Sequence, residues 1–192
     1  MKKIANFISI IGHPLLAIPV FILIVMFGSE VASNASLISF LIIGCVFIPM
    51  ILWMYLKAKN GTYTNFDVSN KTQRKSLFLF AVPLLIVVTV ILFVTHQSKN
   101  LCISVLFALI LLVISQIVNF FIKSSLHVSF NIYLASLIFT QNYKIGIVVL
   151  LYTALISWSR VKLGRHTLKE VLVGLFIGIV ISVIMLKVEG TI

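Results

Sequence analysis

The amino-acid sequence predicts an all-α fold, a polytopic transmembrane bundle of six or seven helices. Hydrophobic residues make up 61% of the 192-residue chain, and charged residues make up only 10%. The mean hydropathy is +1.20, far above that of soluble globular domains. The longest polar stretch, 57–75, is too short to form a soluble domain. We therefore expect residues 1–192 to form one integral-membrane domain.

Seven apolar runs define the expected helices. A membrane helix needs about 20 mostly apolar residues. Four runs clearly reach that length, two shorter runs are separated by "QNYK", and a last run precedes the C-terminus; they cover 4–27, 35–56, 76–95, 101–122, 127–143, 145–160 and 168–187. The pattern favours seven helices over six.

The first run begins like a secretory signal, with "MKK" before an apolar stretch. A signal core contains only about 7–15 apolar residues, and this run is longer, so we expect a retained helix. Pro14 and Pro19 predict kinks in it.

Basic residues are distributed unevenly over the predicted loops. With seven helices, the N-terminus, 57–75, 123–126 and 159–167 share one face, which receives twelve of the fifteen basic residues: Lys2, Lys3, Lys57, Lys59, Lys71, Arg74, Lys75, Lys123, Arg160, Lys162, Arg165 and Lys169. The opposite face receives Lys99, Lys144 and Lys187. The positive-inside tendency predicts that the charged face is cytoplasmic. The net charge of +11 is explained by membrane topology, so we expect no nucleic-acid partner.

The stretch "SRVKLGRHTLKE" carries residue types suited to binding and attacking a phosphate. Arg160 offers a planar fork of donors, and His166 opens a helix whose free N–H groups favour an anion. Glu170 follows His166 by one turn and can hold one imidazole nitrogen protonated, leaving the other as a nucleophile. Thr167 with Glu170 also fits a capping box, and the cations fit an interfacial role. On these residues alone, the structural and functional interpretations are equally favoured.

Two further loops add candidates on the same face. The loop "KSSLHVSFN" supplies His127 as a general acid or base, and Lys123 and Ser125 as ligands for phosphate oxygens. In the loop "NFDVSNKTQRKS", Arg74 would complete a clamp on a tetrahedral anion.

These residues resemble the motifs of the type 2 phosphatidic acid phosphatase superfamily, KxxxxxxRP, PSGH and SRxxxxxHxxxD. Ser159, Arg160 and His166 fit the third motif, with Glu170 in place of its aspartate. The stretch "SSLH" at 124–127 fits the second motif in part. The first motif is matched by Arg74, with Asp67 at its lysine position and Lys75 at its proline position.

The resemblance implies a role for each matched residue. His166 would attack phosphorus and Glu170 would orient it, while His127 would protonate the leaving group. Arg160, Arg74 and Ser125 would hold the phosphoryl oxygens, and no metal or other cofactor is implied. Leu126, in place of a glycine, is expected to crowd the phosphate, and Asp67 puts an anion where a phosphate ligand is expected. Lys71 or Lys123 would compensate.

The implied function is that of an integral-membrane phosphatase acting on a lipid phosphate or diphosphate, such as phosphatidic acid, phosphatidylglycerol phosphate or a polyprenyl diphosphate. Its partners would be that substrate and the surrounding membrane lipids. The alternative is a non-catalytic lipid-phosphate binder or carrier of the same fold, which the departures at Asp67, Lys75 and Leu126 favour. An ion transporter is disfavoured because few polar side chains interrupt the apolar runs: Gln116, Asn119 and Asn131.

Overall fold

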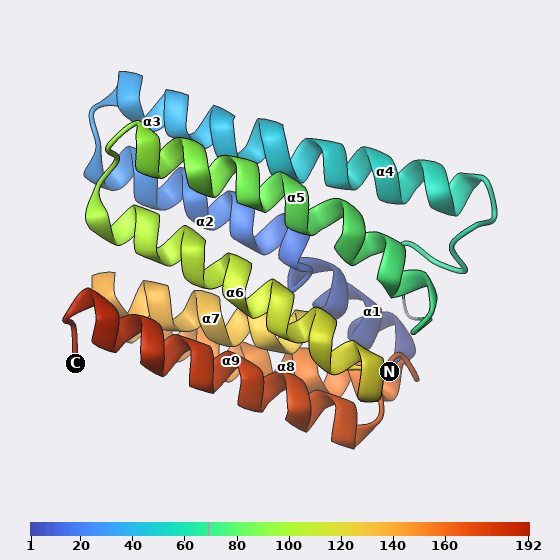
Figure 1. Cartoon of the computed structure of the whole chain (residues 1–192). Coiled ribbons are helices and arrows are strands. Elements are labelled where there is room, and N and C mark those ends of the chain that lie inside the picture. The colour runs from blue at the N-terminus through green and yellow to red at the C-terminus, as the bar shows by residue number, and fades with distance from the viewer. Residues whose placement is uncertain (69) are drawn as a thin grey trace.

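The computed structural model describes residues 1–68 and 70–192, and every regular element in that part of the chain is a helix (Figure 1). The elements are α1 (Lys2–Ile11), α2 (Pro14–Ser29), α3 (Ala32–Ser39), a π-helical segment η1 (Phe40–Phe47), α4 (Ile48–Lys59), α5 (Gln73–Val94), α6 (Lys99–Phe121), α7 (Leu126–Gln141), α8 (Tyr143–Lys162) and α9 (Leu168–Glu189). The predicted all-helical membrane fold is thus confirmed.

The first apolar run is broken between α1 and α2. The two helices meet at 44°, with His13 at the N-cap of α2 and Pro14 in its first turn. Proline is favoured there because its missing N–H would have no partner in the first helical turn. The predicted kink is therefore found at Pro14, whereas Pro19 lies inside the continuous helix α2.

Five helices in the described residues are long and apolar enough to cross a membrane, or six if the bent pair α1–α2 counts as one. The segments α3, η1 and α4 form one of them, a span of 28 residues. The run 127–143, expected as the fifth of seven spans, corresponds to α7, which has only 16 residues and is not among these candidate spans. Its first ten positions are largely buried by other helices, because α7 packs against both α8 and α9 inside the bundle.

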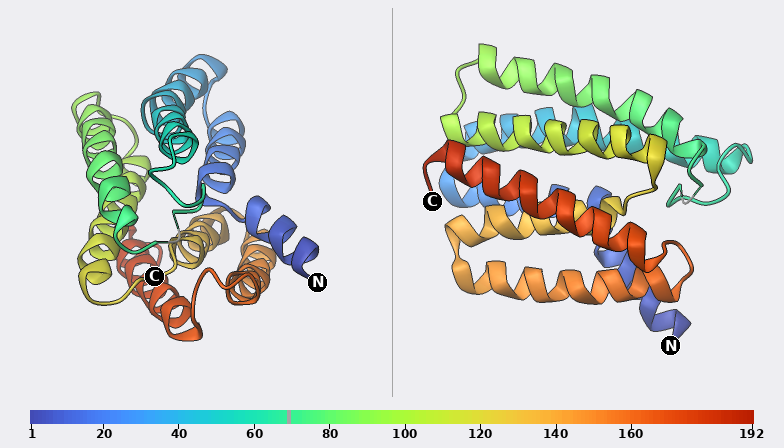
Figure 2. Two further views of the ribbon diagram at one scale, coloured as in Figure 1. Left: turned by 90° about the vertical axis from the view of Figure 1, so that its right-hand side faces the viewer. Right: turned by 60° about the horizontal axis from the view of Figure 1, so that its bottom comes forward.

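The long helices run side by side, with both α5–α6 and α6–α9 in contact (Figure 2). Large apolar side chains cover their outward faces, among them Phe40 at 76% exposure and Phe176 at 69%. Such a surface requires an apolar solvent. A multi-pass membrane protein therefore accounts for both the lengths and the outer faces of these helices.

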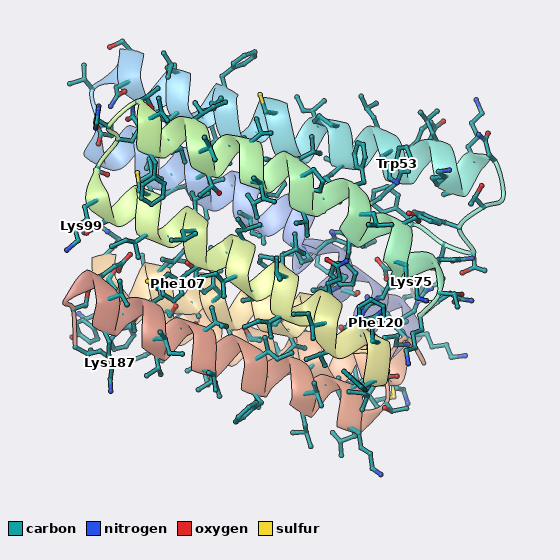
Figure 3. All side chains as sticks on the ribbon, in the orientation of Figure 1. Trp53, Lys75, Lys99, Phe107, Phe120 and Lys187 are labelled. Atoms are coloured by element: carbon teal, nitrogen blue, oxygen red, sulfur yellow. The ribbon has the colours of Figure 1, made fainter. Side chains whose placement is uncertain are left out.

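The predicted segregation of the loops is also found. The N-terminus, the α4–α5 loop, the α6–α7 loop and the α8–α9 loop lie at one end of the bundle (Figures 1 and 2). Lys99 and Lys187 lie at the opposite end from Lys75 (Figure 3). The first of these ends, called the charged end below, receives the candidate phosphate-binding residues.

An elongated cavity of about 410 Å³ lies within the bundle, and its lining includes residues of the charged end. His127 and Arg74 lie at one limit of its lining and Gln141 and Glu189 at the other. From His127 to Gln141, α7 advances about 21 Å at 1.5 Å per residue. Most of the wall between these limits is apolar and comes from α2, η1, α5, α6 and α7.

Candidate active site

His166 and Glu170 form a hydrogen-bonded pair at the start of α9. Nδ1 of His166 lies 3.0 Å from Oε2 of Glu170. Because an ionised carboxylate can only accept, this contact places the ring proton on Nδ1 and leaves Nε2 unprotonated. The same Oε2 accepts the backbone N–H of Thr167 at 3.0 Å, and the Thr167 hydroxyl accepts the N–H of Glu170. The capping box and the imidazole contact therefore exist together.

The turn before α9 brings His166 into a buried and cationic environment. Gly164 adopts a left-handed conformation, with φ of +66°, which ends α8 and lets the chain reverse. His166 is only 4% exposed. Burial, with Arg74, Arg160 and Lys123 nearby, lowers the pKa of the His166 imidazole to about 2. The ring is therefore neutral at physiological pH, as a nitrogen nucleophile must be.

Arg160 is fully buried in the last turn of α8. Its Nη1 donates to Oδ2 of Asp67 at 2.7 Å and to Oγ of Ser9 at 2.6 Å. Among the residues that the structure describes, no group accepts a hydrogen bond from Nε or Nη2 of Arg160. One edge of the guanidinium is thus held by protein, and the other offers two donors to an anion.

Arg74 approaches His166 from α5 and is 2% exposed. Its Nε donates to the carbonyl of Val68, and its Nη1 donates to the carbonyl of Ser124. Its Nη2 lies 3.5 Å from Nε2 of His166. A phosphoryl group attached to that nitrogen would be within reach of the Arg74 guanidinium.

The loop before α7 is packed tightly against α9. The backbone N–H of Ser125 donates to the carbonyl of Glu170 at 3.1 Å. A Cβ at Gly174 would lie 2.6 Å from the carbonyl oxygen of Ser125, so only glycine fits this contact without displacement. The stretch "GLFIG" at 174–178 therefore serves helix packing, which sets the distance between the second and third motifs.

Several polar atoms of this loop are buried without a partner within the described ranges 1–68 and 70–192: Oγ of Ser124, Oγ of Ser125 and Nε2 of His127. Buried polar atoms normally have hydrogen-bond partners. The backbone of this loop contacts Arg74 and Glu170, so these atoms lie at the same site as His166, which is consistent with a site that is completed by a polar ligand.

Lys123 adds a further cation to the site. Its Nζ donates to the carbonyl of Arg165 at 2.8 Å and lies 3.4 Å from Oε2 of Glu170. It therefore connects the loop before α7 with the loop before α9.

Other residues considered from sequence lie elsewhere. Lys71 donates to the carbonyls of Phe120 and Phe121 at the end of α6, so it does not compensate for Asp67. Lys75 lies over the ring of Phe120 (Figure 3). Leu126 packs against the apolar core and lines the elongated cavity.

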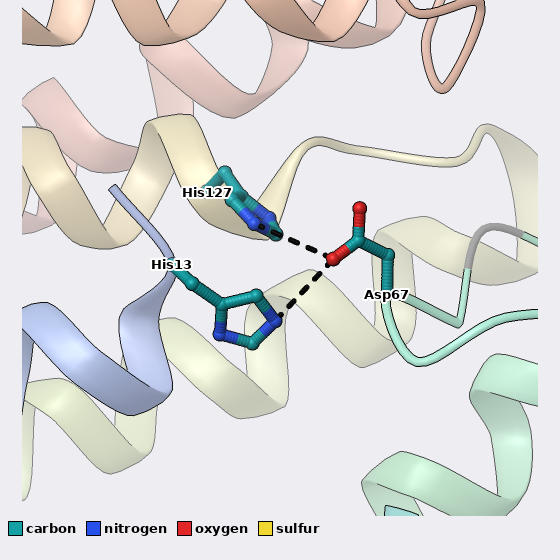
Figure 4. A group of neighbouring side chains, drawn as sticks. All are labelled: His13, Asp67 and His127. Atoms are coloured by element: carbon teal, nitrogen blue, oxygen red, sulfur yellow. Dashed lines mark ion pairs between the residues drawn. The ribbon is translucent and has the colours of Figure 1, made fainter. Parts of the chain in front are cut away.

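Sequence reasoning missed His13 and Ser9, which the α1–α2 break brings to the site. Nε2 of His13 lies 3.5 Å from Oδ1 of Asp67, and Nε2 of His127 lies 4.0 Å from the same oxygen (Figure 4). The rings of His13 and His127 meet edge to face, with centroids 4.6 Å apart. The sequence "GHP", a histidine before a proline at a helix start, is the signal that would have indicated an N-cap here.

The candidate ligand atoms of His13, Asp67 and His127 lie within 4.8 Å of one another, which is compatible with a metal ion by distance alone. Their protonation and their contacts fit polar packing around Asp67 better than metal binding. Nδ1 of His13 accepts the N–H of Leu15, so the proton of the neutral ring is on Nε2, the atom that faces Asp67. A metal ligand needs an unprotonated nitrogen there, and Arg160 already neutralises Asp67.

The fold and the site define a multi-pass helical membrane protein with two buried arginines, Arg74 and Arg160, near His166 at one end of its bundle. The family model of the PAP2 superfamily matches residues 119–191. The match covers less than half of the chain, but it contains the second and third motifs, so the resemblance is confirmed over α7, α8 and α9. No curated protein and no solved structure matches the chain.

Proposed function

We propose that the chain is an integral-membrane lipid phosphate phosphatase that works through a phosphohistidine intermediate. The observation that carries this proposal is the pairing of a neutral, oriented His166 with the free Nε–Nη2 edge of Arg160. Phosphoryl transfer depends mainly on positioning and on stabilising the charge of the equatorial oxygens. These groups supply both requirements.

In the first step, Nε2 of His166 attacks phosphorus, and the bond between phosphorus and the lipid oxygen breaks. Glu170 accepts a hydrogen bond from Nδ1–H throughout and stabilises the positive charge that develops on the ring. The negative charge of the bound phosphate favours the protonated form of His127, which gives the proton on its Nε2 to the leaving oxygen. The products of this step are phosphohistidine and the lipid alcohol, or the lipid monophosphate when the substrate is a diphosphate.

In the second step, water attacks the phosphoryl group and the bond from phosphorus to Nε2 breaks. His127 takes a proton from that water, so it returns to its initial protonation state. Arg160, Arg74, Lys123 and the hydroxyl of Ser125 bind the phosphoryl oxygens in both steps. Orthophosphate then leaves the site.

The cavity supports a lipid as the substrate. It begins beside His127 and Arg74 and continues between apolar walls for most of the length of α7. An amphiphile could place its phosphate among the cations while a hydrocarbon chain occupies the apolar cavity. A soluble phosphate ester would leave those walls without a matching apolar group.

The charged end is proposed to face the cytoplasm. It holds twelve of the fifteen basic residues, and cytoplasmic loops are enriched in lysine and arginine. A reporter fused after Lys187 would then lie outside the cytoplasm. A reporter that is active in the cytoplasm when fused there would contradict the proposed orientation.

A non-catalytic lipid-phosphate binder is the second candidate, favoured by the carboxylate of Asp67 beside the anion site. Phosphate release from a panel of lipid phosphates, using purified protein in detergent, separates the two. Release that depends on His166 supports the phosphatase. Saturable binding with no turnover on any member of the panel supports the binder. A protein that neither binds nor hydrolyses any member of the panel would contradict both candidate functions.

A further inference from the structure

We infer that His13 is a positioning residue that acts through Asp67 to aim the free edge of Arg160 at the phosphate. This inference rests on the proposed function and adds a residue outside the three motifs. His13 lies in the break between α1 and α2, far in sequence from the other site residues. Four contacts carry the inference.

The first two contacts fix the ring of His13. Its Nδ1 accepts the backbone N–H of Leu15 at 3.2 Å, so the ring is anchored to the first turn of α2. Nε2 then carries the proton of the neutral ring and points to Oδ1 of Asp67 at 3.5 Å (Figure 4). The anchor on one nitrogen determines the donor on the other.

The remaining contacts fix the guanidinium. Oδ2 of Asp67 accepts from Nη1 of Arg160 at 2.7 Å, and Oγ of Ser9 contacts the same nitrogen at 2.6 Å. A carboxylate that simply replaced a phosphate would engage the bidentate edge of the arginine. Asp67 instead occupies a single nitrogen, and Nε and Nη2 have no partner in the described part of the chain.

The break between α1 and α2 is therefore connected to the anion site by a chain of contacts, from Leu15 to His13, Asp67 and Arg160. This arrangement explains how an aspartate can stand at the lysine position of the first motif. It occupies the side of Arg160 that faces away from the free edge, and His13 holds it in place. Losing the His13 contact would let the carboxylate turn toward the vacant donors and compete with phosphate.

Two substitutions separate this role from helix capping. His13→Asn keeps an acceptor for the N–H of Leu15, and asparagine is a favourable N-cap, but its side chain is too short to reach Asp67. His13→Gln loses the cap geometry but carries an N–H group at about the position of Nε2. Neither substitution introduces a charge. The exposed His96, in the loop at the opposite end, provides the control His96→Asn.

The experiment measures kcat and KM for phosphatidic acid in detergent and the inhibition constant of orthovanadate, with thermal unfolding to check folding. We expect His13→Asn to raise KM and the vanadate inhibition constant by about tenfold, because the carboxylate of Asp67 would lose one of its polar contacts. We expect His13→Gln to remain within about threefold of the wild type. When His13→Asn is added to Asp67→Asn, it should have no further effect on the inhibition constant, because the carboxylate that His13 contacts is already gone.

The inference is overturned if His13→Asn binds vanadate like the wild type, or if His13→Gln raises the inhibition constant more than His13→Asn does. It is also overturned if the effects of His13→Asn and Asp67→Asn on the inhibition constant are additive in the double variant. Should one variant fail to fold, the other still gives a decisive inhibition constant. Absence of both turnover and vanadate binding in the wild-type protein would instead count against the proposed function. The two failures are therefore distinguishable.

Discussion

Oε2 of Glu170 lies 3.0 Å from Nδ1 of His166 and 3.0 Å from the backbone nitrogen of Thr167. One oxygen therefore fixes both the start of α9 and the orientation of the imidazole. The structural and functional interpretations that the sequence leaves open are two consequences of a single contact. A helix start held in this way is also a fixed position for the proposed nucleophile.

Glu170→Gln and Thr167→Ala separate these two consequences. Glutamine keeps a side-chain oxygen for the N–H of Thr167 but loses the negative charge beside His166, so we expect kcat to fall about 100-fold. Thr167→Ala removes the cap hydroxyl and should cost about 1 kcal/mol of stability while kcat changes little. Steady-state kinetics and thermal unfolding of both variants check this. Equal losses of kcat would mean that Glu170 acts only as a cap.

Arg160→Lys should be severe although the positive charge is kept. Lysine cannot contact Asp67 and Ser9 while also presenting two donors to a phosphate, so kcat/KM should fall about 100- to 1,000-fold. Lys162, two residues later and exposed, provides the matched control, and Lys162→Ala should stay within about twofold. Phosphate release from both variants is the measurement. A mild effect at Arg160 would remove it from the proposed phosphate clamp.

Gly174→Ala should disturb the site from a distance. The added Cβ would meet the carbonyl of Ser125 at 2.6 Å, which forces α9 away from the loop that carries Ser125 and His127. We expect a lower unfolding temperature and at least a tenfold loss of kcat/KM, since small misplacements of reacting groups are costly. Gly28→Ala, where no atom lies within 4 Å of the new Cβ in the described structure, should change neither quantity. A normal Gly174→Ala variant would contradict the tight packing of α9 on this loop.

The low pKa of His166 predicts how stability depends on pH. Folding lowers this pKa from 6.5 to about 2, so below pH 6.5 the unfolded state binds a proton that the folded state does not. Stability should therefore fall as the pH decreases from about 6.5 towards 2. His166→Gln removes this contribution, and its unfolding temperature should fall less between pH 7.5 and pH 5 than that of the wild type. Equal decreases in the two proteins would contradict the assignment.

The fold follows closely from sequence because long apolar runs need only local information. Each of the seven runs corresponds to one helix or to two or three consecutive helical segments, and the ends of the runs 76–95 and 101–122 lie within three residues of the ends of α5 and α6. The number of helices that cross the membrane was less predictable. Burial of α7 by its neighbours allows a helix of 16 residues, which hydropathy alone cannot distinguish from a full span.

The site was only partly predictable, for a physical reason. His166 and Glu170 are four residues apart on one helix, so their contact follows from helical geometry. The contacts of Arg160 with Ser9 and Asp67 depend instead on how α1, α8 and the α4–α5 loop pack together. Asp67 looked unfavourable in the sequence because its partners on α8 and in the α1–α2 break could not be seen.

The most direct test of the proposed nucleophile is a single-turnover experiment with a lipid carrying labelled phosphate, quenched before hydrolysis is complete. The wild-type protein should carry the label in a linkage that is labile to acid and stable to alkali, as a phosphohistidine is, and His166→Asn should carry none. An equal amount of that label on His166→Asn, or undiminished phosphate release by it, would contradict the assignment of His166 as the nucleophile.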